Sequence, residues 1–247
     1  MSKNIFKNTK NASFLMVRHG ESIWNYDSIF TGWSDIPLTN NGIKHAMNMG
    51  EILNHNRLFP KIIFTSMLDR TLQTSKILVS EFKDNKDDNS EIKIEQSWRL
   101  NEKHYGYLNG VKRKKIREDF GEQFTRDMRK SYTMFPPITD DRLEHQKYPI
   151  YQNTYYNLHP QGESKKMMLR RLLPYWYETV LPCIRLDMLP LICTHKHTAR
   201  VLMKHLKQIP DDSFHEYELP DKTIMKITLN MDGYLQNEEE IKYENTD

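Results

Sequence analysis

The sequence has few cysteines and no long apolar run, and both features restrict the class of protein that it encodes. Its two cysteines, Cys183 and Cys193, do not support a disulfide-stapled scaffold, and Cys193 lies in an apolar stretch typical of a buried thiol. No segment approaches the roughly 18 apolar residues that span a membrane. The first ten residues are polar, unlike a secretory signal. We therefore expect free thiols and a cytoplasmic protein without membrane contact.

The charge is nearly balanced, which argues against a nucleic-acid partner. The 247 residues include 36 basic and 33 acidic side chains, for a formal net charge of +3. Such a balance provides no broad positive surface for a phosphate backbone. A basic run, Lys112 to Lys115, is more typical of a solvated helix start. The length suits one large domain, which we expect to span 1–247.

Short apolar runs alternate with segments of helical period, and this pattern predicts an α/β fold. It predicts buried strands at 14–17, 61–65 and 189–194, an alternating strand at 92–94, and a last edge strand at 223–229. Helices are expected at 39–54 with Thr39 as N-cap, from 66 onward, at 164–180 with a break or kink at Pro174, and at 198–207. The expected architecture is a three-layer sandwich, with a mostly parallel central sheet and helices on both faces.

Three segments lack a clear apolar period. Residues 83–90 are polar and predict an exposed loop. Residues 111–150 combine basic helical stretches with three prolines and few apolar anchors, which indicates a lid-like insertion over the site. Residues 231–247, acidic from Asn237 onward, are expected to form a flexible tail.

The most informative feature is the way the first strand ends. The apolar run Phe14 to Val17 stops at Arg18, His19, Gly20 and Glu21, and open α/β sheets bind ligands at this carboxyl edge. Histidine can be a neutral nucleophile near pH 7 and a cation after it accepts a group. Arginine offers forked donors to phosphate oxygens, and a glycine lets the backbone turn and approach an anion closely. Together these residue types indicate a phosphohistidine site.

The surrounding sequence resembles the 2,3-bisphosphoglycerate-dependent phosphoglycerate mutase family of the histidine phosphatase superfamily. The resemblance is carried by Arg18 to Asn25, Phe30 to Thr39, Ser97 to Gly106, Arg129 to Tyr132, Pro136-Pro137 and Thr194-His195. It covers roughly residues 13–230. The resemblance implies that 3-phosphoglycerate and 2-phosphoglycerate are interconverted through a phosphohistidine, with 2,3-bisphosphoglycerate as primer and intermediate and no metal. Small-molecule phosphoglycerates are the implied partners, and a homodimer or homotetramer is common among relatives.

The resemblance also implies roles for individual residues. His19 would be the nucleophile, within a phosphate pocket made by Arg18, Arg70 and His195, and Glu102 would transfer the proton that the reaction requires. The implied substrate-binding residues are Ser22, Asn25, Thr31, Gly32, Tyr105, Arg113, Arg129, Lys130, Lys196 and His197.

The sequence departs from the family after His195. The family usually has glycine, asparagine and serine there, whereas this chain has Lys196, His197 and Thr198, and the later turn Leu219 to Thr223 lacks the usual glycine. A left-handed backbone at Lys196 would cost about 1 to 2 kcal/mol. Three functions therefore remain open: a phosphoglycerate mutase, a histidine or bisphosphoglycerate phosphatase in which water attacks the phosphohistidine, and an impaired paralogue with a binding or regulatory role.

Overall fold

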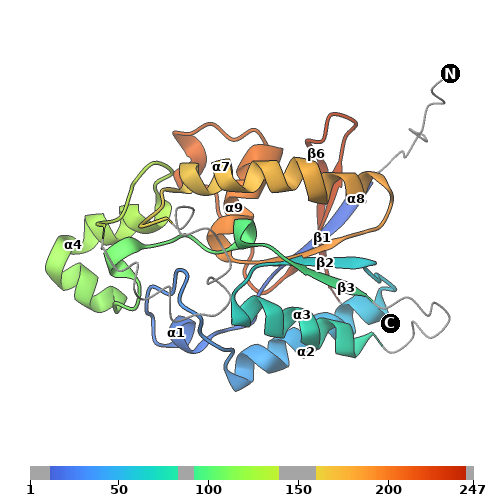
Figure 1. Cartoon of the computed structure of the whole chain (residues 1–247), viewed down its shortest axis with the longest axis horizontal. Helices are drawn as coiled ribbons and strands as arrows, with labels where there is room; N and C mark the ends of the chain where they lie inside the picture. The colour runs from blue at the N-terminus through green and yellow to red at the C-terminus, as the bar shows by residue number, and fades with distance from the viewer. Residues whose placement is uncertain (1–11, 83–91, 139–159, 243–247) are drawn as a thin grey trace.

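A six-stranded sheet lies at the centre of the structure (Figure 1). The computed structural model describes residues 12–82, 92–138 and 160–242. Parallel pairing joins four strands in the order β3-β2-β4-β1, and β5 and β6 follow antiparallel at the side of β1. The predicted mostly parallel α/β sheet is confirmed. The strands are Ala12–Arg18 (β1), Ile62–Thr65 (β2), Lys93–Gln96 (β3), Leu191–Thr194 (β4), Ile224–Leu229 (β5) and Leu235–Ile241 (β6).

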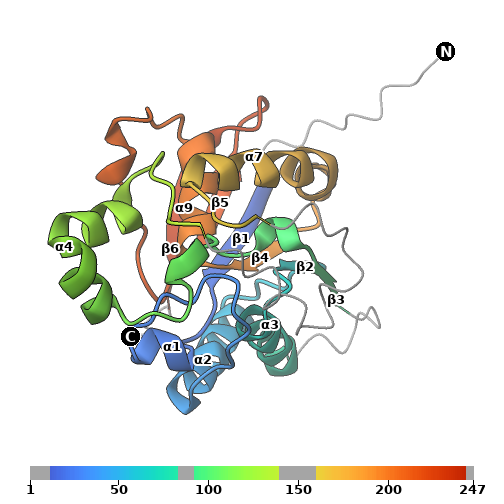
Figure 2. The same ribbon diagram turned by 60° about the vertical axis from the view of Figure 1, so that its left-hand side comes forward.

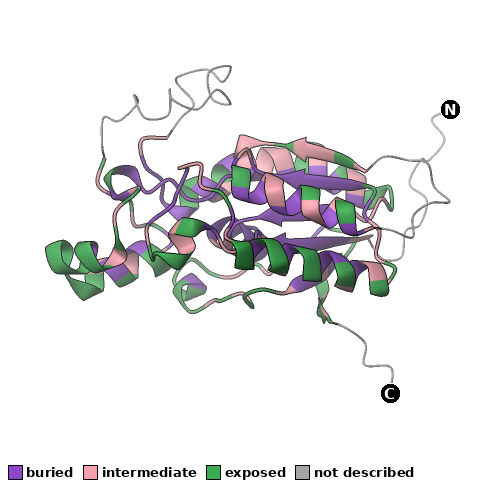
Figure 3. Cartoon of the chain, turned by 90° about the horizontal axis from the view of Figure 1, so that it is seen from below, coloured by how far each residue is buried: buried purple, intermediate pink, exposed green. Residues whose placement is uncertain are grey.

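Helices cover both faces of this sheet (Figures 1 and 2). One face carries α2 (Asn40–His55) and α3 (Asp69–Glu81), and the other carries α7 (Lys165–Tyr175) and α9 (Lys196–Leu206). Side chains of β1 alternate between two apolar cores, because successive residues of a strand point to opposite faces. Phe14 and Met16 pack with α7 and α9, while Leu15 and Val17 pack with α2 and α3. Figure 3 shows the buried strands between helices whose outer surfaces are exposed.

Further helices and turns lie at the end of the sheet where β1 stops (Figures 1 and 2). They are the short helix α1 (Ile23–Tyr26), the 3-10 turns η2 (Trp98–Leu100) and η3 (Gly106–Leu108), and the basic helix α4 (Arg113–Lys130). Gly121 kinks α4 with φ 86° and ψ 165°. Of the segment predicted as a lid, residues 111–138 are described and contain α4, whereas 139–150 lie outside the described residues, as does the predicted loop at 83–90. None of the helices in the described ranges has the length and apolar character needed to cross a bilayer.

The expectations for the C-terminal segment were wrong in part. The strand at 223–229 is not an edge strand, because β5 lies between β1 and β6. Residues 235–241, expected in a flexible tail, form β6, and ion pairs join this strand to its neighbours, including Lys226 with Glu239 at 2.8 Å and Lys207 with Glu238 at 2.5 Å. The acidic composition hid this strand, because an edge strand tolerates charged side chains on its exposed positions. Residues 243–247 lie outside the described residues.

The helix expected at 164–180 is longer than predicted and is not broken at Pro174. After α7, the chain continues through a π-helical turn (η5, Trp176–Val180) into α8 (Leu181–Arg185). A wider π turn accommodates local irregularity without ending the helix. The helix expected from Thr198 begins at Lys196 instead. Thr39 caps α2 as predicted, since its hydroxyl accepts the N–H of Gly42 at 3.0 Å, and both cysteines are free.

Candidate active site

The edge where β1 and β4 end carries a cavity of about 280 Å³. Arg18 pairs in register with Thr194, so His19 and His195 both follow directly at this edge. Six lining side chains are cationic and three are acidic, which gives the cavity a positive excess suited to an anion. The lining residues are Arg18, His19, Glu21, Asn25, Ile29, Phe30, Thr31, Gly32, His45, Arg70, Glu102, Tyr105, Arg113, Arg129, Lys196, His197, Asp221 and Lys222.

The imidazole of His19 is held in one tautomer. Its Nδ1 lies 2.6 Å from the carbonyl oxygen of Gly20, and because a carbonyl only accepts, Nδ1 carries the hydrogen and Nε2 keeps a free lone pair. Burial lowers the pKa of His19, and the positive charges of Arg70 and Arg18 lower it further, well below the usual histidine value. The ring is therefore neutral near pH 7, the state in which it can act as a nucleophile.

Gly20 is required for a different reason from the one the sequence indicates. Its φ is not in the left-handed region, so the turn itself does not demand glycine. A β-carbon at this position would lie 2.3 Å from the carbonyl oxygen of Gly42, and one on Gly42 would lie 2.1 Å from the carbonyl oxygen of Glu21. The strand end carrying His19 therefore packs backbone to backbone against the start of α2.

His195 lies directly beside His19, with the ring centroids 5.0 Å apart and the ring planes at 64°. Nε2 of His195 shares a hydrogen bond of 2.9 Å with the hydroxyl of Ser66, and its Nδ1 has no hydrogen-bond partner among the described residues. Burial, Arg70 and His19 hold its pKa well below the usual value. His195 is completely buried and does not line the cavity. Its ring contact with His19 is therefore its link to the cavity.

Two arginines reach His19 from different elements. Arg70, on the first turn of α3, is buried and donates to the carbonyl oxygens of Gly32 at 2.8 Å and of Ser34 at 2.9 Å, so the loop at 32–34 fixes its guanidinium. Arg18 forms an ion pair of 2.5 Å with Asp221. Burial raises the pKa of Asp221, but the charge and hydrogen bond of Arg18, with smaller contributions from Lys196 and Lys222, together lower it below its usual value. A phosphate that binds Arg18 must therefore compete with this carboxylate.

Glu102 follows η2, and its main chain is tightly fixed. Its carbonyl oxygen accepts from the indole N–H of Trp33 at 2.6 Å and from Arg171 at 3.0 Å. Its Oε1 accepts the backbone N–H of Lys103 at 2.7 Å. Burial raises the pKa of Glu102, but the charge and hydrogen bond of His197, together with smaller contributions, lower it more, so the pKa lies well below its usual value. The carboxylate is therefore ionised near pH 7.

Helix α4 contributes a cation from each side of its kink. Arg113 begins α4, and Arg129 lies in its last turn; both line the cavity together with the buried ring of Tyr105. The ammonium of Lys103, buried below the site, donates to the carbonyl oxygen of Met128 at 3.0 Å, and burial lowers its pKa to about 8. Buried lysine hydrogen bonds thus fix the end of α4 on which Arg129 lies.

The residues that depart from the family pattern take ordinary helical positions. Lys196 is the first residue of α9 and has no left-handed backbone, so the strain considered for this position does not arise. Its ammonium lies 3.2 Å from the carboxylate of Glu218. In the turn without the usual glycine, Lys222 adopts φ 60°, a conformation that costs a lysine about 1 to 2 kcal/mol. The missing glycine therefore strains the turn at Lys222 and leaves α9 unstrained.

The structure brings most of the proposed site residues together. Ser22, Lys130 and His195 do not line the cavity. Ser22 is buried and caps α1, where its hydroxyl accepts the N–H of Asn25 and the Asn25 side chain accepts the N–H of Ser22. Lys130 lines two other hollows, and Arg129 also lines one of these. The other predicted site residues line the cavity: Arg18, His19, Asn25, Thr31, Gly32, Arg70, Glu102, Tyr105, Arg113, Arg129, Lys196 and His197.

Some residues that line the cavity, and some that hold the Glu102 segment in place, were not predicted from the sequence. Glu21, His45 and Asp221 line the cavity, and only Glu21 stands inside a recognised motif. The main support is the buried pair of Arg171 and Glu163, with Nε and Oε1 2.6 Å apart. Arg171 donates to the carbonyl oxygens of Trp98, Arg99, Asn101 and Glu102. The helix start predicted at 164, directly after Glu163, was the one local signal near this pair.

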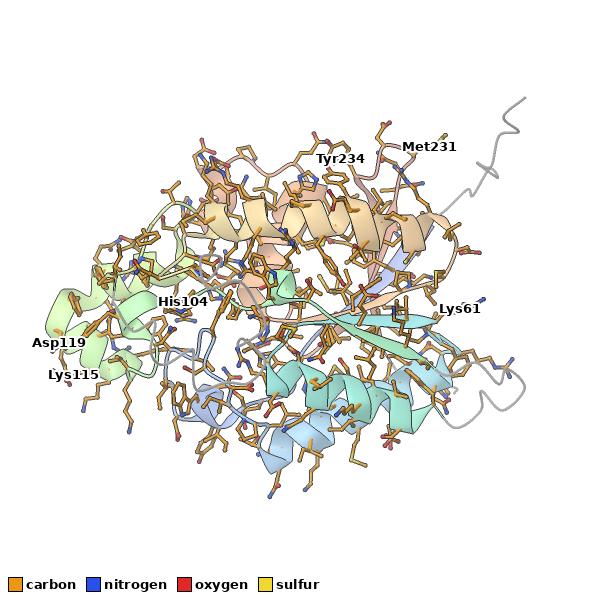
Figure 4. The ribbon with its side chains drawn as sticks, in the orientation of Figure 1. Lys61, His104, Lys115, Asp119, Met231 and Tyr234 are labelled. Carbon is orange, nitrogen blue, oxygen red and sulfur yellow. The ribbon has the colours of Figure 1, made fainter. Side chains whose placement is uncertain are left out.

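The outer turns of α4 are solvated. Lys115 and Asp119 lie four residues apart and form an exposed ion pair of 2.5 Å, and both lie on the outer side of the helix (Figure 4). The basic run at 112–115 is therefore largely a solvated helix start, except for Arg113. In the part of the chain that the structure describes, no three His, Cys, Asp or Glu side chains gather as ligands of a metal ion.

Comparison with known families identifies this arrangement. The model of the histidine phosphatase superfamily (branch 1) matches residues 14–238. The chain belongs to this superfamily. The 2,3-bisphosphoglycerate-dependent phosphoglycerate mutase of Thermobifida fusca is 33% identical to this superfamily member over 223 residues, covering 90% of this chain and 88% of the relative. That of Tropheryma whipplei (strain Twist) is 34% identical over 221 residues, covering 90% and 95%.

Solved structures of the same fold include proteins named as phosphatases of substrates other than 2- and 3-phosphoglycerate. A mycobacterial glucosyl-3-phosphoglycerate phosphatase superposes with a TM-score of 0.68 at 20% identity, covering 91% of this chain and 96% of that protein. A putative alpha-ribazole-5'-P phosphatase from Escherichia coli gives a TM-score of 0.64 at 16% identity, covering 93% and 95%. At these identities the likeness shows the fold and leaves the activity and substrate of this superfamily member open.

Proposed function

We propose that the protein is a phosphoglycerate mutase that interconverts 3-phosphoglycerate and 2-phosphoglycerate through a phosphohistidine on His19. One observation carries the proposal: a neutral imidazole with a free Nε2 lies in a cavity that also holds several cations and an ionised glutamate. The names of the mutases that align over 90% of the chain support it further.

Transfer of a phosphoryl group to His19 mainly requires that the donor be positioned in line with Nε2 and that the negative charge on the phosphoryl oxygens be compensated. The phosphorus atom would approach Nε2, while Arg70 and Arg18 offer donors to the equatorial oxygens, on which negative charge accumulates in phosphoryl transfer. His195, edge-on to His19 at 5.0 Å, limits the orientations open to that ring. The phosphorylated imidazole would then gain charge among fixed donors, and little rearrangement is required.

Return of the phosphoryl group to an alcohol requires a base. A hydroxyl of the bound phosphoglycerate loses its proton as its oxygen attacks phosphorus, and the bond from phosphorus to Nε2 breaks with its electron pair returning to His19. Glu102, ionised and lining the same cavity, is placed to accept that proton. The same group, once protonated, returns the proton to an alkoxide leaving in the opposite half-reaction.

The cavity is suited to a small, strongly anionic molecule. Its volume of about 280 Å³ is near the lower end of ligand pockets in proteins. In addition to Arg18 and Arg70, the cavity is lined by Arg113 and Arg129. These two arginines would hold a second anionic group. We therefore include 2,3-bisphosphoglycerate in the proposal, as the donor that primes His19 and as the intermediate that turns over in the cavity.

A phosphatase is the second candidate. Asp221 competes for Arg18, and Glu218 pairs with Lys196 at the rim, so acids already engage two cations that would retain a bisphosphorylated intermediate. Weaker retention favours attack by water on the phosphohistidine. Structures with the same fold carry phosphatase names, which makes this a concrete alternative.

One experiment separates the two activities. Purified protein is incubated with 3-phosphoglycerate and a trace of 2,3-bisphosphoglycerate, and phosphorus NMR follows 2-phosphoglycerate and inorganic phosphate, with His19→Ala as control. The proposal expects 2-phosphoglycerate to form well ahead of inorganic phosphate, and neither to form in the control. Release of inorganic phosphate without isomerisation would replace the mutase by the phosphatase.

A further inference from the structure

His197 lies between the carboxylate of Glu102 and the backbone carbonyl of Arg129. It is the second residue of α9 and is buried, with its ring edge-on to Tyr105 at 6.0 Å between centroids. Its Nε2 lies 3.2 Å from the carbonyl oxygen of Arg129. Because a carbonyl has no hydrogen to donate, Nε2 must carry the hydrogen in this contact. In the neutral ring, Nδ1 is therefore left with a lone pair.

That lone pair faces the carboxylate of Glu102. Nδ1 lies 3.4 Å from Oε2, and while the ring is neutral this nitrogen has no hydrogen-bond partner among the described residues. The attraction and hydrogen bond that lower the pKa of Glu102 act when His197 is protonated. Burial lowers the pKa of His197 to about 4, in spite of the neighbouring Glu102, so near pH 7 neither group carries a proton. Two acceptors thus face each other in a buried place, where electrostatic repulsion is stronger than in water. A proton between them would turn the repulsion into a hydrogen bond.

The charges around Glu102 and His197 lower the affinity of Glu102 for a proton, so a second acceptor beside it matters. Arg129 and Lys103 adjoin these two residues from α4 and the Glu102 segment, Lys165 and Arg200 from α7 and α9, and His195 from the end of β4. Cations beside a carboxylate lower its affinity for a proton. A second acceptor that shares the proton raises that affinity, and an anionic substrate raises it again.

We infer that Glu102 and His197 act as one proton-accepting pair, in which Oε2 and Nδ1 share the proton released by the substrate hydroxyl. The inference rests on the proposed function. The hydroxyl oxygen of the substrate forms a bond to phosphorus. The bond between phosphorus and Nε2 of His19 breaks, and its electron pair returns to Nε2. The hydroxyl proton passes to Oε2 of Glu102, where it forms a hydrogen bond to Nδ1 of His197. In the reverse half-reaction the pair returns it to the leaving alkoxide. His197 acts through Glu102 and is a positioning residue.

The test compares two phosphoryl donors in the same step. When 2,3-bisphosphoglycerate gives a phosphoryl group to His19, the leaving group is a phosphoglycerate alkoxide that must be protonated. When p-nitrophenyl phosphate does so, the leaving group is p-nitrophenolate, which is stable and needs no acid. Single-turnover phosphorylation of His19 is measured with each donor in wild type and in His197→Gln, whose side-chain amide can still donate to the carbonyl of Arg129. We expect the rate with 2,3-bisphosphoglycerate to fall at least ten-fold and the rate with p-nitrophenyl phosphate to change less than two-fold.

Four further variants sharpen the comparison. His205→Gln makes the same substitution on α9 at a residue whose Nε2 contacts the hydroxyl of Tyr177, outside the cavity lining, and should leave both rates unchanged. Glu102→Gln should show the same selective loss, and adding His197→Gln to it should cause no further loss, because residues that act as a unit are not additive. His197→Phe, which keeps a ring against Tyr105, covers the case in which the glutamine disturbs packing.

The outcomes distinguish the inference from the proposed function. Equal loss with both donors in both His197 variants, no loss with either donor, or a double variant whose losses multiply would overturn the pair while His19 remains the phosphorylated residue. Absence of any phosphohistidine in the wild type with both donors would instead remove the proposed function and the pair with it.

Discussion

Arg171 shows how a single buried residue positions the segment that carries Glu102. It contacts the carboxylate of Glu163 and four carbonyl oxygens between Trp98 and Glu102, and both charged side chains are almost fully buried. Glu163 also accepts the backbone N–H of His104 at 2.9 Å. A buried ion pair contributes modestly as a pair, but the loss of one partner leaves an uncompensated charge.

Replacement of this arginine should therefore be strongly destabilising. We expect Arg171→Met to lower the free energy of unfolding by about 3 to 5 kcal/mol, because Glu163 and the segment's carbonyls lose their donors. Urea denaturation followed by circular dichroism measures this. Arg170→Met, at the exposed neighbouring position, is the matched control. Arg171→Met combined with Glu163→Gln should recover part of the loss. A change below about 1 kcal/mol in Arg171→Met would contradict the role assigned to this pair.

At this scale, sequence predicts the reacting groups better than their supports. His19 and Arg18 follow directly from a buried strand and a recognisable motif, so their place at the sheet edge was predictable. Arg171 lies 69 positions from Glu102, and their contact depends on the packing of α7. Asp221 reaches Arg18 across 203 positions. A local pattern cannot encode such contacts, because they arise only when distant elements meet. Ser22 shows the opposite error. Its place in the motif predicted a substrate-binding role, but in the structure it caps α1 and does not line the cavity.

Among the elements, α4 has a shape that one residue determines. Gly121 adopts φ 86° and ψ 165°, a region open almost only to glycine. The kink lets Arg113 and Arg129, from opposite ends of α4, line the same cavity.

Gly121→Ala should disturb substrate binding more than chemistry. The strain of about 1 to 3 kcal/mol would push α4 toward a different bend and separate Arg113 from Arg129. We expect KM for 3-phosphoglycerate to rise about ten-fold with kcat changed less than three-fold. Gln123→Ala, an exposed position two residues away, should leave both constants unchanged. An unaltered KM in Gly121→Ala would show that the bend does not position the arginines.

Element prediction from sequence succeeded where burial is two-sided. Strands β2 and β4 are buried along their length, and their continuous apolar runs are distinctive. β6 is half exposed and rich in glutamate, so composition outweighed its weak alternation. Pro174 indicated a break, but the following π turn keeps the chain helical. These differences reflect tertiary packing, which a local pattern does not contain.

For the whole molecule, the buried histidines of the site make stability depend on pH. His19, His195 and His197 have folded-state pKa values below the unfolded value of about 6.5. The unfolded chain therefore binds more protons below that pH, and the stability present above pH 6.5 is lost as the pH falls toward about 4, the value to which burial lowers the pKa of His197. Lys165, whose pKa burial lowers to about 6, acts in the same direction above pH 6.

We expect the free energy of unfolding to decrease from pH 7.5 to pH 5, by up to about 1.4 kcal/mol per pH unit for each histidine that titrates. Urea titrations at half-unit intervals of pH measure this slope. His197→Phe should reduce it, because one of the three histidines is removed. A free energy of unfolding that stays constant across this range would contradict the neutral, buried state assigned to the three rings.

The central claim is that His19 carries a phosphoryl group. The most direct measurement is incubation of the protein with radiolabelled 2,3-bisphosphoglycerate, followed by acid and alkali treatment of the protein and mass spectrometry of its peptides. We expect one acid-labile, alkali-stable phosphoryl group on His19 in the wild type, and no label in His19→Ala. A wild-type protein that takes up no label, or takes it up at another residue, would contradict the account.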